Sequence, residues 1–169
     1  MKLNFLVIIL SLFYTFSHSA GTKNEDNKGD KKNESSSKEY KLSGEDKDND
    51  KIEFNIALKL IKSKDYNKAI TKLKTLVNST STDFSKADVY NELGFAHRKK
   101  NDFENADKYY KKSLEINPSH LGALEYQGEM YIDLGQLNKA KQNLSKLKDL
   151  VGENNSYYKE LELYILNNS

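Results

Sequence analysis

The chain repeats part of itself at a fixed spacing, and this spacing constrains its fold more than any other feature. Gly94 and Ala106 recur as Gly128 and Ala140, each at the same distance further along the chain. A fixed period of roughly 20 to 50 residues is the sequence signature of proteins built from stacked supersecondary units. The chain is also polar, with 37% hydrophobic and 31% charged residues, so it indicates no broad buried sheet.

The central copy, residues 87–120, contains the clearest pattern of apolar and small residues. Tyr90 and Leu93 lie three positions apart, which places them on one face of a first helix. Ala106 and Tyr110 lie four apart, on one face of a second helix. The Asn-Asp pair at 101–102 predicts the turn between them, with the aspartate as the N-cap of the second helix.

This pattern resembles the tetratricopeptide repeat, a helix–turn–helix unit of about 34 residues. The residues that carry the resemblance are Ala69 in a first copy, Tyr90, Leu93, Gly94, Ala106, Tyr110 and Pro118 in the central copy, and Gly128, Tyr131 and Ala140 in a third. Two positions depart from the family pattern, because Tyr90 replaces its Trp and His97 replaces its Tyr. The resemblance implies an all-α fold, a right-handed α-solenoid of about three repeats. The main alternative is another solenoid of helical hairpins with a similar period.

The repeats are expected at about residues 50–83, 87–120 and 121–154, followed by a capping helix at about 156–167. The interval from Ala69 to Ala106 exceeds the period by three positions, and these are assigned to the polar stretch 78–83. A terminal helix with a polar outer face is expected, because the last repeat of a solenoid has no further neighbour. The repeat domain as a whole is expected over residues 51–167.

The N-terminal segment, residues 1–19, is typical of a secretory signal peptide. Lys2 provides a positive start, residues 3–16 are nearly all apolar, and Ser17 and Ser19 are small residues at the positions that a signal peptidase reads. The apolar run is shorter than the roughly 20 residues that span a bilayer as a helix. We expect export, with a periplasmic location implied by the resemblance to small exported bacterial proteins of this family. The alternative is an uncleaved segment that anchors the protein in the membrane.

Residues 20–50 are predicted to form a disordered charged linker. The stretch mixes lysines with aspartates and glutamates, and Tyr40 and Leu42 are its only bulky apolar residues. Such a segment buries too little apolar surface to offset the entropy lost on ordering. A solvated tether is the expected role, and a segment that folds on contact with a partner is the alternative.

The sequence contains no pattern that predicts catalysis, a cofactor or a metal, and we expect a protein that is not an enzyme. It has no cysteine, and its histidines show no metal-ligand spacing. His97 is interpreted as a packing residue and His120 as a solvated turn residue. The net charge is only +2 and Arg98 is the single arginine, so nucleic acid is not an expected partner.

The resemblance implies that the first helix of each repeat lines a groove for a protein or peptide. The candidate groove residues are Phe54, Leu58, Asn91, Phe95, Arg98, Glu125, Tyr126 and Glu129. They predict an apolar end, a mixed aromatic and basic middle, and an acidic end. Phe95 and Tyr126 are the preferred anchors, since exposed aromatic residues are frequent in interfaces.

One subclass of the family clamps a carboxylate with Lys and Asn at fixed positions of the groove. The corresponding positions here are Phe54, Leu58, Glu92, Gly122 and Tyr126. None provides a suitable pair of donors, so this mode of binding is not expected.

The function predicted from the sequence is an adaptor of the cell envelope that binds a protein or peptide in the groove. The first alternative is a structural envelope component that associates with itself, in which case Phe54 and Ile61 at the apolar end would favour homo-oligomers. The second is an accessory subunit that assembles or regulates an envelope enzyme. No insertion into the membrane is expected after the signal peptide is cleaved.

Overall fold

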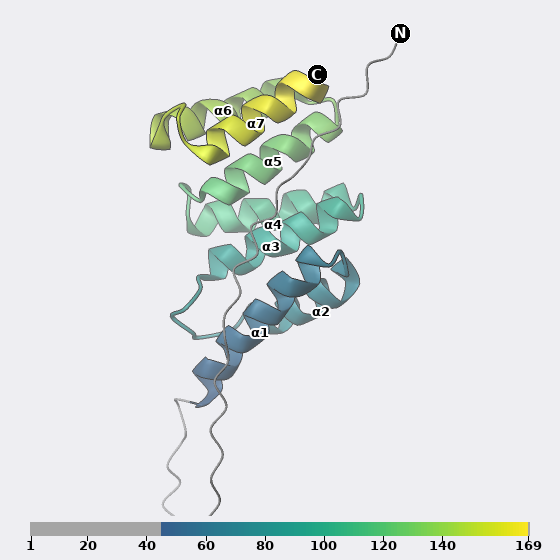
Figure 1. Ribbon diagram of the computed structural model, residues 1–169, viewed down its shortest axis with the longest axis vertical. Helices are drawn as coiled ribbons and strands as arrows, with labels where there is room; N and C mark the ends of the chain where they lie inside the picture. The colour runs from purple at the N-terminus through teal and green to yellow at the C-terminus, as the bar shows by residue number, and fades with distance from the viewer. Residues whose placement is uncertain (1–44, 169) are drawn as a thin grey trace, which may run out of the picture. The chain divides into compact units, whose positions relative to one another are not determined.

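The computed structural model describes residues 45–168, which form seven helices and no strand (Figure 1). The helices are α1 (Glu45–Lys62), α2 (Tyr66–Leu76), α3 (Lys86–Lys99), α4 (Phe103–Ile116), α5 (Leu121–Asp133), α6 (Leu137–Val151) and α7 (Ser156–Asn168). The all-α class and the solenoid predicted from the repeat are confirmed.

The helices form three hairpins, α1 with α2, α3 with α4 and α5 with α6, and α7 packs on α5 and α6. The first helices of the units contact one another in order, since α1 meets α3, α3 meets α5, and α5 meets α7. Among the residues described, α2, α4 and α6 do not contact one another. The stack therefore bends toward the row of α1, α3, α5 and α7, which we call the inner layer.

The same local geometry closes each hairpin. Lys64, Asn101 and Gly135 occupy equivalent places after the first helix, and all three have a positive φ, of 64°, 59° and 69°. Two of the second helices start on an aspartate cap, since Asp65 and Asp102 accept hydrogen bonds from backbone amides three positions further on. Glycine adopts this left-handed backbone without steric cost, and asparagine tolerates it better than lysine does.

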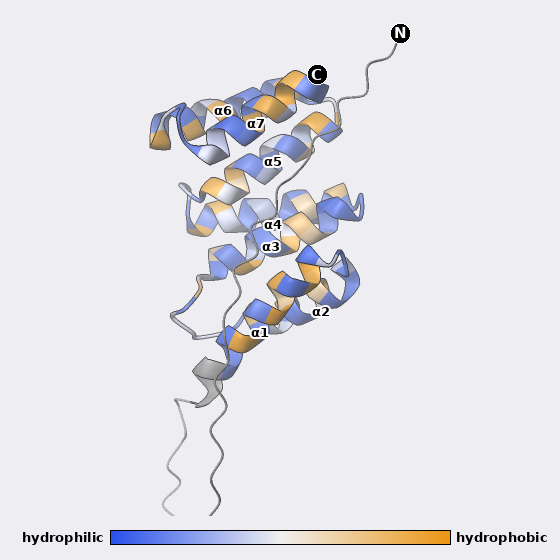
Figure 2. Cartoon of the chain, in the orientation of Figure 1, coloured by the Kyte–Doolittle hydropathy of each residue, from blue (hydrophilic) through white to orange (hydrophobic). Residues whose placement is uncertain are grey.

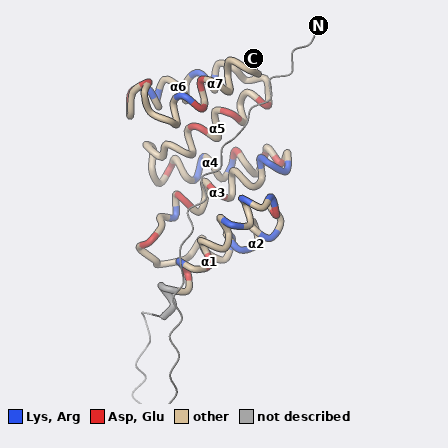
Figure 3. The backbone as a smooth tube through the Cα atoms, in the orientation of Figure 1, with Lys and Arg blue, Asp and Glu red and all other residues tan. Residues whose placement is uncertain are grey.

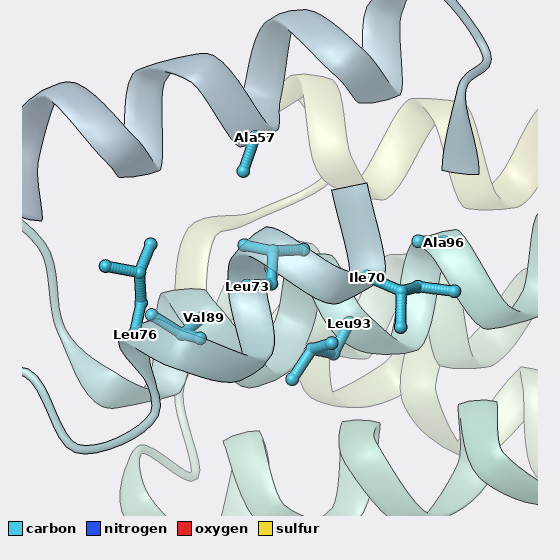
Figure 4. Packing of buried hydrophobic residues seen from close by; sticks show 7 residues of the cluster. All are labelled: Ala57, Ile70, Leu73, Leu76, Val89, Leu93 and Ala96. Carbon is cyan, nitrogen blue, oxygen red and sulfur yellow. The ribbon is translucent and has the colours of Figure 1, made fainter. Parts of the chain in front are cut away.

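Three clusters of buried apolar side chains fill the spaces between the helices. The first joins α1, α2 and α3 through Ala57, Ile70, Leu73, Leu76, Val89, Leu93 and Ala96 (Figure 4). The others centre on Ala106, Tyr110, Ala123 and Met130, and on Leu124, Ala140, Leu147 and Leu161. Every cluster takes side chains from neighbouring units, so each unit completes the core of the next. Figure 2 shows the consequence, with apolar stripes alternating with polar faces along each helix.

The repeat-signature residues occupy the closest contacts of this core. Ala69, Leu93, Ala106, Tyr110 and Ala140 are fully buried. Tyr90 and Tyr131 are partly buried against the core, whereas Pro118 is exposed in the turn between α4 and α5. The two helical glycines mark close approaches. A Cβ at Gly94 would lie 2.6 Å from the Tyr110 ring in α4, and a Cβ at Gly128 would lie 2.6 Å from a methyl of Leu161 in α7.

The N-terminal boundary differs from the one predicted. Helix α1 begins at Glu45, so the end of the predicted linker at residue 50 falls inside a helix. The start of this helix is held by the polar loop after α2, because Ser79 Oγ donates to Asp50 Oδ2 at 2.5 Å and Lys51 pairs with Asp83 at 3.1 Å. The composition of a segment does not predict contacts of this kind, because they join residues about 30 positions apart in the sequence.

The predicted signal peptide and most of the predicted linker, residues 1–44, lie outside the described residues. Within residues 45–168, no helix combines the length and the apolar character that crossing a bilayer requires.

Replacing Gly94 with alanine is expected to destabilise the protein. The added methyl group meets the rigid ring of fully buried Tyr110, and overpacking of this kind costs about 1–3 kcal/mol, against a gain of about 1 kcal/mol in helix propensity. Urea denaturation measures the change. Gly128→Ala is the matched control, because the methyl groups of Leu161 can rotate away, and it should be close to neutral. A Gly94→Ala variant as stable as the wild type would contradict this account.

Candidate functional site

The aromatic candidates of the inner layer pack against their own chain. Phe54 stacks on Phe84 with ring centroids 4.5 Å apart, and Phe95 packs on Tyr126 at 4.9 Å. Tyr126 also packs against the cluster around Tyr110, and Leu58 is half-buried. Phe95 and Tyr126 are therefore partly buried against each other, and their role as partner anchors stays a prediction. Aromatic residues at the groove positions of adjacent repeats are close enough to pair with each other.

Arg98 forms the centre of a polar network that links three helices of the inner layer. Its Nε donates to Asp133 Oδ2 at 2.7 Å, and its Nη1 pairs with Glu129, both on α5. Its Nη2 donates to the Tyr164 hydroxyl of α7 at 3.1 Å, and that hydroxyl donates to Asp133 Oδ1 at 2.5 Å. Only 3% of Arg98 is exposed.

The predicted basic character in the middle of the groove is wrong at Arg98, since this charge is already neutralised by two carboxylates. Lys99, the other basic residue of this region, is exposed and lies 5.1 Å from the centre of the Phe95 ring. Sequence periodicity places Arg98 on the correct face, but it does not reveal which residues of the next repeat that face contacts.

Glu125 of α5 is 6% exposed, yet the described residues offer it no ion pair or hydrogen bond. Glu129, one turn further along α5, Glu160 of α7 and Arg98 of α3 all act on its carboxyl electrostatically. Burial, followed by the repulsion from Glu129 and Glu160, raises the pKa of Glu125 to about 8. Few native side chains of this charge are so deeply buried without a partner.

A second acceptor-rich position lies on α3, where Asn91 packs against Gly122 of α5. Asn91 is buried, its Nδ2 donates to Glu92 Oε1 at 3.1 Å, and its Oδ1 has no partner among the described residues. Burial raises the pKa of Glu92 to about 7, with Asp88 adding a smaller effect. The hydroxyl of fully buried Tyr110 also lacks a partner within residues 45–168.

The inner layer carries mainly acidic residues over α5 and α7, whereas α3 carries residues of both signs (Figure 3). Its carboxylates are Asp88, Glu92, Glu125, Glu129, Asp133 and Glu160. The acidic residues thus extend from the predicted acidic end toward the middle of the layer. The single charge of Arg98 offsets only one of its two carboxylate partners, Glu129 and Asp133, and Arg98 does not pair with Glu92 or Glu125. The surface offers hydrogen-bond acceptors in excess of donors.

The histidines have structural roles. His97 is buried, as predicted for a packing residue, and its Nδ1 lies 2.8 Å from Asp102 Oδ2. The prediction of a solvated His120 is wrong. This residue caps α5, since its Nδ1 accepts from the Ala123 amide at 3.1 Å, and its Nε2 therefore donates to Asp88 Oδ1 at 3.0 Å. A histidine directly before a predicted helix start was the available signal. Within residues 45–168, no cluster of three or more potential metal ligands occurs.

The stability of the protein should fall as the pH rises toward 8. The folded state raises the pKa of Glu125 from 4.5 to about 8, so folding takes up a proton between these values and is favoured at the lower pH. Glu125→Gln removes the part of this dependence that Glu125 causes and keeps the shape of the side chain, whereas the part caused by Glu92 remains. We expect it to raise the melting temperature at about pH 8 and to change it little at about pH 5.

Glu115→Gln is the control for this measurement, because Glu115 is exposed on α4 and loses the same formal charge. It should shift the melting temperature little at either pH. An equal response of the two variants would show that Glu125 is not held in a desolvated state.

Comparison with known proteins agrees with this fold. The family model described as Tetratricopeptide repeat matches residues 87–120. The chain is similar to PcrH, whose crystal structure is in complex with the chaperone binding region of PopB, with a TM-score of 0.58 and 14% identity over 72% of this chain and 95% of that one. It is also similar to the C-terminal TPR-containing domain of a Plasmodium falciparum protein described as FK506-binding, with a TM-score of 0.54 and 21% identity over 76% and 94%. Residues 87–120 thus match the tetratricopeptide repeat, and the fold of the described residues is similar to that of these two solved structures.

Proposed function

We propose that this protein is a non-enzymatic adaptor that holds a segment of a partner protein against its inner layer. The observation that carries the proposal is a pair of largely buried side chains on this layer whose acceptors residues 45–168 do not satisfy, namely the Glu125 carboxyl and the Asn91 Oδ1. Buried polar groups are normally hydrogen-bonded, so such a set is typical of a surface that is completed by binding. PcrH, which has a similar fold, was solved with a segment of another protein.

The chemistry of the inner layer supports binding rather than catalysis. Its reactive side chains have structural partners, since His97 contacts Asp102 and His120 caps α5. The remaining polar groups are carboxyls, amides and phenols, which supply hydrogen bonds and charge. The proposal therefore assigns the chain no reaction of its own.

The same proposal includes export and a role in the cell envelope, supported by the apolar segment and the small residues within positions 1–19. We expect the mature chain to begin at Ala20 and to be recovered from the periplasmic fraction. Mass measurement of the purified full-length product determines its N-terminus. A chain that retains Met1 and stays with the membrane would instead support the anchored alternative.

Self-association is a second candidate function, favoured by exposed apolar residues at the two ends of the stack. On α7, Leu163 and Leu166 are 54% and 72% exposed, and Ile52 on α1 is 56% exposed. The predicted residues Phe54 and Ile61 do not form this surface, because both pack against the first core cluster. Light scattering over a concentration series tests whether the ends meet, since stacking end to end gives open oligomers.

Phe95→Ala is expected to weaken partner binding at least tenfold, because Phe95 is partly exposed at the centre of the inner layer and supports the Tyr126 ring. The measurement is quantitative capture of the partner by the full chain, with cross-linking and mass spectrometry to locate the contact. Ile116→Ala is the control, since Ile116 is an exposed apolar residue on α4, outside the inner layer. Cross-links confined to α2, α4 and α6, with Phe95→Ala binding normally, would refute the proposed face.

A further inference from the structure

We propose that the bound segment carries a lysine or arginine side chain, and that Glu125 receives its cationic end group between α3, α5 and α7. This inference rests on the proposed function and specifies the chemistry of the partner. It concerns a single position in the inner layer, so it can fail while the adaptor function stands.

Glu125 is a largely buried carboxyl without a hydrogen-bond donor among the described residues, 45–168. Only 6% of the residue is exposed, and its carboxyl oxygens retain contact with solvent. A buried carboxyl is stable when a cation or several hydrogen-bond donors satisfy it. Arg98 does not fulfil this role, because its guanidinium already bonds Glu129, Asp133 and Tyr164.

The neighbouring helix α3 also offers a hydrogen-bond acceptor. Asn91 Oδ1, on the adjacent helix α3, is also an acceptor without a partner among the described residues, and Asn91 packs across the helix interface against Gly122 of α5. A lysine ammonium offers three donors and no acceptor, and a guanidinium offers five. A cationic end group therefore matches a surface that has spare acceptors, whereas an anionic or amide group would bring acceptors of its own.

The charged residues that act on Glu125 are mainly carboxylates. Glu129 lies one turn from Glu125 on α5, and both Glu129 and Glu160 repel the negative form of Glu125. Carboxylates gathered on a partly desolvated surface concentrate a negative potential, which attracts cations and repels acidic segments. The charge around this position therefore favours a basic side chain over a neutral or acidic one.

An aromatic surface lies next to Glu125 on α5. Tyr126 follows Glu125 directly and packs on Phe95, which places an aromatic pair next to the acidic group. Lysine and arginine bury their aliphatic stems on apolar surfaces while their charged ends remain with polar groups. The inner layer thus presents a surface for the stem beside a carboxyl for the charge.

Selection of short random peptides by the full-length protein at low salt tests this inference. We expect the selected peptides to be enriched in lysine or arginine, and replacement of one such residue by glutamine to weaken binding about tenfold by fluorescence polarisation. Glu125→Gln should cause a similar loss and reduce the salt dependence, whereas Glu115→Gln should not. Glu125→Gln is expected to remain folded, which its melting temperature verifies.

Proton release provides a second readout that a purely structural role would not give. A cation at Glu125 favours its charged form against the opposing effects of Glu129 and Glu160, so binding near pH 7 should release a fraction of one proton. Calorimetry in two buffers of different ionisation enthalpy measures it, and Glu125→Gln should abolish it.

The outcomes separate the two proposals. This inference would be overturned if the selected peptides are acidic or apolar. If those peptides bind Phe95→Ala more weakly but bind Glu125→Gln normally, the adaptor function stays intact. Cationic peptides whose affinity is unchanged by Glu125→Gln would also overturn the inference, because the charge would then be received elsewhere. Selection of no peptide by the wild-type protein would count against both proposals.

Discussion

The close approach of α3 to the ring of Tyr110 is the contact on which the middle of the molecule depends. Gly94 has no side chain, so the ring of Tyr110 in α4 lies directly against the backbone of α3. Tyr110 is fully buried and anchors a core cluster that includes Ala123 and Met130 of α5. The packing within one repeat therefore also positions the first helix of the next.

The inner layer combines features that differ in what they contribute to stability. Arg98 with its two carboxylates and Tyr164 is fully satisfied, although buried ion pairs of this kind often contribute little net stability because desolvation opposes them. Glu125 is unsatisfied by the described residues and lowers stability whenever it is charged. Proteins tolerate such local costs most often where a surface serves binding or chemistry.

The helices and their pairing can be predicted from the sequence because a fixed repeat period leaves few alternatives, and because Gly94 and Ala106 recur at positions that only close helix packing explains. Periodicity identifies which face a residue occupies within its own hairpin. It does not identify the neighbour that this face meets in the next repeat. For that reason periodicity places Arg98 in the groove but does not reveal its carboxylate partners. It also does not show that Phe95 packs on Tyr126 or that His120 bonds Asp88. It misses the start of α1 for the same reason, since the contacts of that helix lie in the loop after α2.

The bond between Arg98 and Tyr164 joins residues 66 positions apart, from the middle repeat to the last helix. In an ordinary solenoid each repeat contacts only its neighbours, so the ends can fray while the centre stays folded. Here α7 is tied through Asp133 of α5 back to α3. Loss of the last helix would remove the hydroxyl that Asp133 and the Arg98 guanidinium both bond, which makes fraying from this end more costly. The segment from α3 to α7 thus has the connectivity of one cooperative unit, whereas α1 and α2 are joined to it mainly by apolar contacts.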